Sequence, residues 1–232
     1  MTVVEGLAYV LVGSRLRRRE VSAGARLALT LFSLWWYSIG INKIIAGVVG
    51  VGVAFDQVSL ALYVAVLHLN LAILCVSLAS LLFYFAFLFT GRRHAIVPVA
   101  AFYLGFYILL TYNLLSHAPD AILKLKWRID HHASSEAHPV VGLLILACLV
   151  LPQLVGAITH FVLYFRTTDP AQRHRIVWVS WSIIAWTVSI TLITTRIFDE
   201  SALVQLFSRL VGVAAAFAGL WAYRVAPPKM SG

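Results

Sequence analysis

Charged residues are scarce in this sequence, and acidic residues are the scarcest. Charged residues occupy 12% of the 232 positions, about half the share that is usual in soluble domains, and the mean hydropathy is +0.90. This composition excludes a soluble globular protein and indicates an integral membrane protein. The nine acidic residues all fall at expected helix ends, in connections or in the N-terminal segment: Glu5, Glu20, Asp56, Asp120, Asp130, Glu136, Asp169, Asp199 and Glu200.

Cysteine is also rare, and catalytic motifs are absent. Cys75 and Cys148 lie inside apolar segments and match neither a CxxC nor a Cys/His ligand spacing. The sequence has no GxSxG, HExxH, P-loop or dinucleotide-binding motif. The outer-loop histidines and acids show no fixed ligand spacing either, so we predict no metal site. These absences favour a protein that is not an enzyme, without excluding one.

The net charge of +9 has its source in basic residues that cluster in alternate connections between apolar segments. Clusters of this kind are typical of contact with anionic lipid headgroups. Basic residues that bind nucleic acid are instead gathered on one face of a soluble domain. We therefore expect membrane lipids as partners and no nucleic acid.

Six apolar stretches are long enough to cross a bilayer, which takes about 20 residues. We predict an all-α bundle of six transmembrane helices over residues 27–224, within a single integral membrane domain that covers residues 1–232. Asp169 and Pro170 are a favourable pair for the start of the fifth helix. The expected spans are 27–53, 58–90, 95–116, 140–165, 170–195 and a sixth from about 199 or 201 to 224.

Two segments outside the spans have patterns of their own. Residues 2–13 are apolar but too short to span, and arginines follow at 15 and 17–19, so we expect a short interfacial helix within residues 1–20. In the longest connection, 117–139, apolar and basic residues alternate over 122–129. Such alternation predicts a β-strand, which we expect to form a hairpin with 131–138 or to pack on helix ends.

The distribution of lysine and arginine predicts the orientation. Twelve of these residues lie on the N-terminal side of the expected spans, four lie on the other side, and two lie inside the spans. Basic residues are concentrated in cytoplasmic connections. We therefore predict a plasma-membrane protein with both termini in the cytoplasm and the 117–139 loop outside.

Small residues spaced four apart predict where helices approach closely. Ala46, Gly50 and Ala54 form one such row on the first span. A second row, Ser208, Gly212 and Ala216, lies on the sixth. We expect each row to pack against a neighbouring helix.

The two cations inside the spans, Lys43 and Arg209, are the main clue to function. An intramembrane charge costs about 2.5–3.5 kcal/mol on insertion scales, so it usually has a partner, a route to water or a role. Both lie in the outer half, from where their side chains can extend to the interface. No acid of the sequence is expected near them. The functional interpretation is an anion site in which the ligand supplies the negative charge.

Several other residues are candidates for the same site. Asn42, His68, Asn70 and Asn113 are expected at a similar depth, and they offer polar contacts. Trp35 and Trp186 lie deeper than an interfacial belt requires. These aromatic residues either surround a lipid-like ligand or pack the core.

The leading hypothesis is therefore a non-enzymatic membrane protein that binds a small anionic or lipid-like ligand, as a sensor or accessory subunit. No cofactor is predicted on this hypothesis. One alternative is an electron-transfer subunit with haem b held by histidines such as His68 and His160. A second is an anion channel or carrier with a hydroxyl-lined path that includes Ser180 and Thr187. A third is a structural partner of other membrane subunits.

Overall fold

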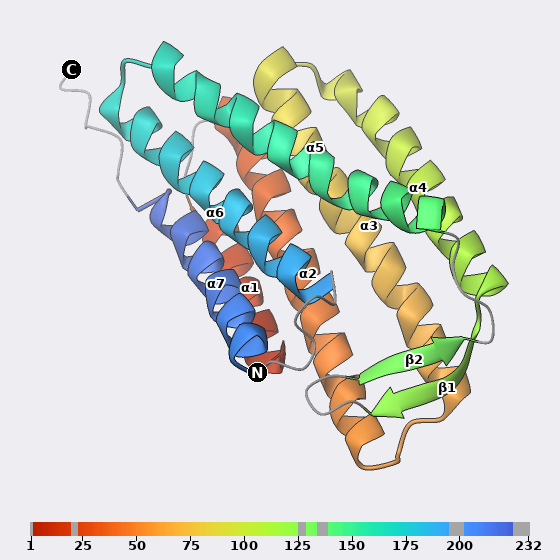
Figure 1. Ribbon diagram of the computed structural model, residues 1–232. Coiled ribbons are helices and arrows are strands. Elements are labelled where there is room, and N and C mark those ends of the chain that lie inside the picture. The colour runs from red at the N-terminus through yellow and green to blue at the C-terminus, as the bar shows by residue number, and fades with distance from the viewer. Residues whose placement is uncertain (1, 20–22, 125–128, 134–138, 195–201, 225–232) are drawn as a thin grey trace.

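The computed structural model describes residues 2–19, 23–124, 129–133, 139–194 and 202–224. In this part the chain forms seven α-helices, one 3-10 helix and an antiparallel pair of short strands. Six of the helices are long and apolar enough to cross a membrane. The predicted all-α, multi-span membrane bundle is thus confirmed, and its helices run side by side in Figure 1.

All six predicted spans are present, with ends that differ from the prediction by only a few residues. Ser59 caps the second span, because its side chain accepts a hydrogen bond from the amide of Leu62 at 3.3 Å. Gly91 ends the same helix in the left-handed conformation, with φ of 64°. The spans are α2 (Ala23–Ala54), α3 (Leu60–Thr90), α4 (Ile96–Ser116), α5 (Pro139–Arg166), α6 (Pro170–Thr194) and α7 (Ala202–Trp221).

Short connections make neighbouring spans antiparallel, which brings the arginines to one end of the bundle. The 3-10 helix η1 (Arg93–Ala95) joins α3 to α4, and Asp169 caps α6 by accepting from the amide of Ala171 at 3.1 Å. We call this the arginine end; it carries Arg26, Arg92, Arg93, Arg166, Arg173 and Arg224. It is the upper end in Figure 1.

The other end carries the hairpin of β1 (Pro119–Lys124) and β2 (Ile129–Ala133). Lys124 is paired with Ile129 and Ile122 with His131 in the antiparallel register. The prediction of a single strand over 122–129 is therefore wrong, because the two ends of this segment belong to opposite strands of one hairpin. Residues 125–128 lie outside the described part. An exposed ion pair between Lys124 and Asp56, with Nζ and Oδ1 2.5 Å apart, ties β1 to the segment after α2.

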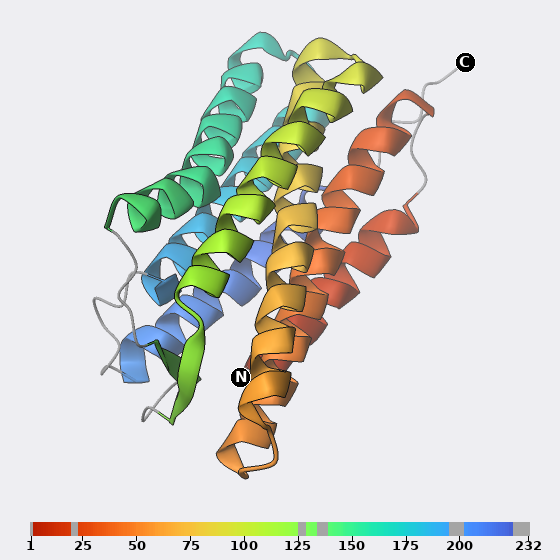
Figure 2. The same cartoon turned by 90° about the vertical axis from the view of Figure 1, so that its right-hand side faces the viewer.

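The short N-terminal helix predicted from the sequence is present as α1 (Thr2–Arg17). It packs lengthwise and antiparallel along α2 and also contacts α7, as Figure 2 shows for its path beside α2. Glycines make this approach close: a Cβ on Gly6 would lie 2.7 Å from the carbonyl oxygen of Gly40. The Ser33 hydroxyl also donates to the carbonyl of Gly13 at 2.6 Å. The sequence predicts that this segment lies at the membrane interface, whereas in the structure α1 packs within the bundle.

The position of α1 explains which small residues form helix contacts. The predicted row on α7 is buried, with Ser208 at 1% and Ala216 at 0% exposure. The predicted row on α2 is not buried in a helix contact, because Ala46 and Ala54 are exposed. Gly40 and Gly47 face α1 instead.

The direction of α1 also affects the expected position of the N-terminus. Its first turn lies toward the hairpin end, whereas the last turn of α7 lies at the arginine end (Figure 1). The sequence predicts both termini on one side of the membrane. The start of α1 instead lies toward the opposite end of the bundle from the last turn of α7, because α1 runs antiparallel to α2.

Candidate functional site

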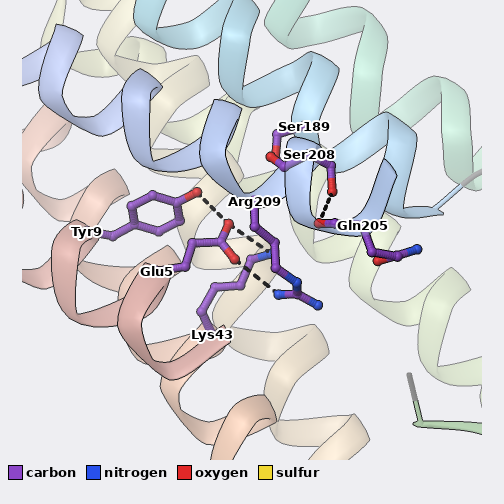
Figure 3. A network of polar contacts seen from close by, with 7 residues as sticks. All are labelled: Glu5, Tyr9, Lys43, Ser189, Gln205, Ser208 and Arg209. Atoms are coloured by element: carbon purple, nitrogen blue, oxygen red, sulfur yellow. Dashed lines mark hydrogen bonds and ion pairs between the residues drawn. The ribbon is translucent and has the colours of Figure 1, made fainter. Parts of the chain in front are cut away.

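Lys43 and Arg209 meet at one carboxylate, which Glu5 of α1 supplies. The Lys43 ammonium lies 3.3 Å from Oε1 of Glu5, and a terminal nitrogen of Arg209 lies 3.2 Å from Oε2. Glu5 is 1% exposed, against 11% for Lys43 and 17% for Arg209. Three helices, α1, α2 and α7, thus place one acid between two bases, as Figure 3 shows. We call these three residues the ion cluster.

The prediction that no acid accompanies the two cations is wrong. It depended on placing residues 1–20 at the membrane surface, where Glu5 would be hydrated. In the structure the glycine contacts of α1 with α2 bring Glu5 to the level of Lys43. A carboxylate beside two cations then lowers the free-energy cost of burying all three charges.

Tyr9, one turn after Glu5, completes the coordination of this carboxylate. Its hydroxyl donates to Oε1 of Glu5 at 2.6 Å. Gly212 of α7 is essential to the arrangement, because a Cβ there would lie 2.3 Å from the Tyr9 hydroxyl and 2.9 Å from Oε1 of Glu5. The row of small residues on α7 therefore makes room for the ion cluster.

The serines beside the cluster in Figure 3 satisfy backbone groups. Ser189 of α6 donates to the carbonyl of Ser208 at 2.6 Å, and the Ser208 hydroxyl donates to the carbonyl of Gln205 at 2.9 Å. The first bond joins α6 to α7 behind Arg209, and the second lies within α7. They leave Tyr9, Lys43 and Arg209 as the groups that contact Glu5.

The charge count of the ion cluster is uneven. Among the residues that the structure describes, Glu5 is the one ion-pair partner of both Lys43 and Arg209. With every group ionised, the cluster carries one surplus positive charge. A single uncompensated charge at this depth is costly, so one further anionic group would stabilise the cluster.

In the described contacts, the predicted asparagines do not bind the ion cluster. Asn42 turns toward α3 and donates from its side-chain amide to the carbonyl of Asn70 at 2.8 Å. The side-chain oxygen of Asn70 is buried and has no partner among the described residues. His68 and Asn113 are half-buried on α3 and α4, and the described contacts join neither side chain to the ion cluster.

The aromatic candidates lie in the middle of the core. Trp35 is 0% exposed and Trp186 is 2% exposed, with ring centroids 5.5 Å apart. Trp36 packs between Trp35 and Tyr9 with tilted ring planes, at centroid distances of 4.3 Å and 5.1 Å. The rings fill the space between α1, α2 and α6 and pack these helices together near the ion cluster.

The residues proposed for haem and for a channel path are also engaged in helix contacts. Nδ1 of His160 lies 3.0 Å from the Ser180 hydroxyl. The Thr187 hydroxyl donates to the carbonyl of Ile183 at 2.8 Å and to the side chain of Gln153 at 3.2 Å. Within the described ranges, no three His, Cys, Asp or Glu side chains gather closely enough to hold a metal ion.

Glu5 is the functional residue that sequence reasoning missed, and a signal for it exists. Gly6 and Gly13 are seven apart, as are Gly40 and Gly47, and two such rows match when two helices pack antiparallel at close distance. With α1 in that position, Glu5 necessarily reaches the interior. Comparison of the chain with known protein families, with curated proteins and with solved structures gives no match.

Proposed function

We propose that this protein is a non-enzymatic membrane protein that binds a small anionic or lipid-like ligand at the ion cluster, as a sensor or an accessory subunit. The observation that supports the proposal is the count of two cations for one carboxylate. Glu5 neutralises one of them, so the ligand supplies one negative charge.

Arg209 is the group that would contact the ligand. It is the most exposed member of the cluster, at 17%. In Figure 3 one end of its guanidinium group faces Glu5 and the other end points away from it. A guanidinium group binds carboxylate and phosphate oxygens in pairs. Lys43 is more enclosed and acts through its charge.

The surroundings of Arg209 suit a lipid-like ligand. Leu206 and Val213 lie one turn before and one turn after Arg209 on α7, and Leu206 is 42% exposed. An apolar tail can lie along this outer face of the helix. Trp35 and Trp186 would support the site from inside the core and would not touch the tail.

The test is lipid retention by the purified protein in native mass spectrometry. The probes are phosphatidylglycerol, with one net negative charge, and phosphatidylcholine, with none. Arg209→Gln leaves Glu5 and Lys43 as a balanced pair, so the bundle should still fold. Arg26→Gln removes the same charge from an exposed position at the arginine end and is the matched control.

We expect Arg209→Gln to weaken phosphatidylglycerol retention about tenfold, which corresponds to about 1.4 kcal/mol, and Arg26→Gln to change it less than twofold. Glu5→Gln raises the surplus charge to two and should strengthen retention. If it unfolds the protein, Glu5→Gln with Lys43→Gln restores a surplus of one and should bind as the parent does. Competition by inorganic phosphate separates a free anion from a lipid headgroup. Equal retention by Arg209→Gln and the parent would refute the proposal.

We propose further that the protein lies in the plasma membrane with its arginine end in the cytoplasm. The supporting observation is the concentration of arginines at one end of the helices. In a variant without Cys75 and Cys148, a single cysteine can replace exposed Gln57 near the hairpin or exposed Thr90 at the arginine end. A membrane-impermeant maleimide added to intact cells should label the first and spare the second. The reverse pattern would invert the orientation.

A further inference from the structure

A cavity lies at the arginine end, away from the ion cluster. It has a volume of about 270 Å³ and is bordered by α2, α3, α5 and α6, and by Tyr223 beyond the end of α7. The lining contains none of the three residues of the ion cluster. The function proposed above therefore leaves this cavity unexplained.

At the rim of the cavity lies a guanidinium group with one N–H that finds no acceptor in the described part of the chain. Arg175 of α6 lines the cavity together with Gln172 and Thr167. Its Nε–H is buried and has no hydrogen-bond partner among the described residues, and its guanidinium carbon lies 5.9 Å from the centre of the Tyr223 ring. A buried guanidinium donor without an acceptor is unfavourable. An oxyanion that spans Nε and a terminal nitrogen would satisfy it with little movement.

The floor of the cavity is formed by rings. His160 of α5 is 4% exposed and points Nδ1 toward Ser180 at 3.0 Å, which leaves Nε2 as the ring nitrogen without a described partner. Tyr84 and Tyr223 also line the cavity. Burial raises the pKa of Tyr223, so its phenol stays neutral and does not repel an anion.

The walls between rim and floor are apolar. Leu29, Phe87, Leu163, Ile176 and Val179 supply most of this surface. Thr167 directly follows the end of α5 and is seven residues from His160, which corresponds to about 10 Å along the helix axis. The volume equals about nine water molecules at about 30 Å³ each, which is near the lower limit of ligand pockets. A phospholipid is too large, whereas a chain of about eight carbons fits.

We propose that this cavity binds a small amphiphilic acid, with its carboxylate at Arg175 and its apolar chain directed toward His160. The Nε–H of Arg175 requires a negatively charged group on the ligand. The apolar walls require an apolar chain, and the volume of the cavity limits the length of that chain. This site is independent of the ion cluster in residues and in position. The proposal for either site can therefore be refuted without affecting the other.

The probe is radiolabelled octanoate, measured by equilibrium dialysis against the protein in nanodiscs of neutral lipid, with empty nanodiscs subtracted. Arg175→Gln removes the proposed carboxylate contact. Arg166→Gln is the matched control, because Arg166 is exposed at the same end and does not line the cavity. Ala28→Leu narrows the cavity without a change of charge, and octanol tests whether the acid group matters.

We expect Arg175→Gln to weaken octanoate binding at least tenfold and Ala28→Leu to abolish it, while Arg166→Gln and Arg209→Gln stay within twofold of the parent. Octanol should bind at least tenfold more weakly than octanoate. Three results would overturn the proposal: no saturable octanoate binding, equal binding of octanol, or equal effects of Arg175→Gln and Arg166→Gln. A loss of octanoate binding in Arg209→Gln alone would assign the acid to the ion cluster instead.

Discussion

Replacing Glu5 with glutamine removes the one negative charge of the ion cluster and keeps the shape of the side chain. The carboxylate now contacts the Tyr9 hydroxyl at 2.6 Å, Arg209 at 3.2 Å and Lys43 at 3.3 Å. Removing one partner of a buried ion pair costs about 3–5 kcal/mol, because the remaining charge is left uncompensated. The two cations are slightly exposed, so we expect the lower value, about 3 kcal/mol, in the free energy of unfolding.

The measurement is reversible unfolding of the purified protein in neutral detergent with increasing dodecyl sulfate. Fluorescence of the seven tryptophans reports the loss of the packed core. Arg209→Gln leaves a balanced Glu5–Lys43 pair and should lower the free energy of unfolding by only about 1 kcal/mol. The double variant leaves Lys43 alone, so its loss should fall short of the sum of the single losses by about 1–2 kcal/mol.

This reasoning fails if Glu5→Gln unfolds within about 0.5 kcal/mol of the parent protein, or if the two substitutions are additive. Either result would mean that the contacts at Glu5 do not couple α1 to α7. A larger loss in Arg209→Gln than in Glu5→Gln would also contradict it, since the first variant is balanced and the second is not.

Four further substitutions test the packing that positions the cluster and the spans. Gly212→Ala places a Cβ 2.3 Å from the Tyr9 hydroxyl and should lower the free energy of unfolding by about 2 kcal/mol; Gly105→Ala meets no atom within 4 Å and should raise it by about 0.5 kcal/mol. Asp169→Ala removes the cap of α6 and should cost about 1 kcal/mol in the same assay. Asp56→Asn breaks the exposed pair with Lys124 and should change stability by less than about 1 kcal/mol, so a larger loss would show that the hairpin supports the bundle.

The six spans could be predicted because their signal is local. A run of some 20 apolar residues must become a helix in lipid, where each backbone group needs a partner inside the segment. Caps such as Asp169 and Gly91 mark the ends for the same reason. Neither inference requires knowledge of which helices are neighbours.

The site could be predicted only in part because it depends on such neighbours. Lys43 and Arg209 were identified by their cost in an apolar segment, whereas Glu5 looked hydrated in a short helix followed by arginines. Whether α1 lies on the membrane or inside the bundle is decided by contacts between Gly6 and Gly40 and between Gly13 and Ser33. The hydrophobicity of residues 2–13 is the same in both positions.

The bond between Glu5 and Arg209 joins residues 204 positions apart. A ribosome releases α1 first and α7 last, so the N-terminal helix exists for nearly the whole of translation before its final partner is made. Until then α2 alone can shelter it, and Glu5 has only Lys43 as a counter-ion. Completion of the last helix is therefore the event that locks the first one in place, and a chain truncated before residue 202 should leave α1 accessible to proteases.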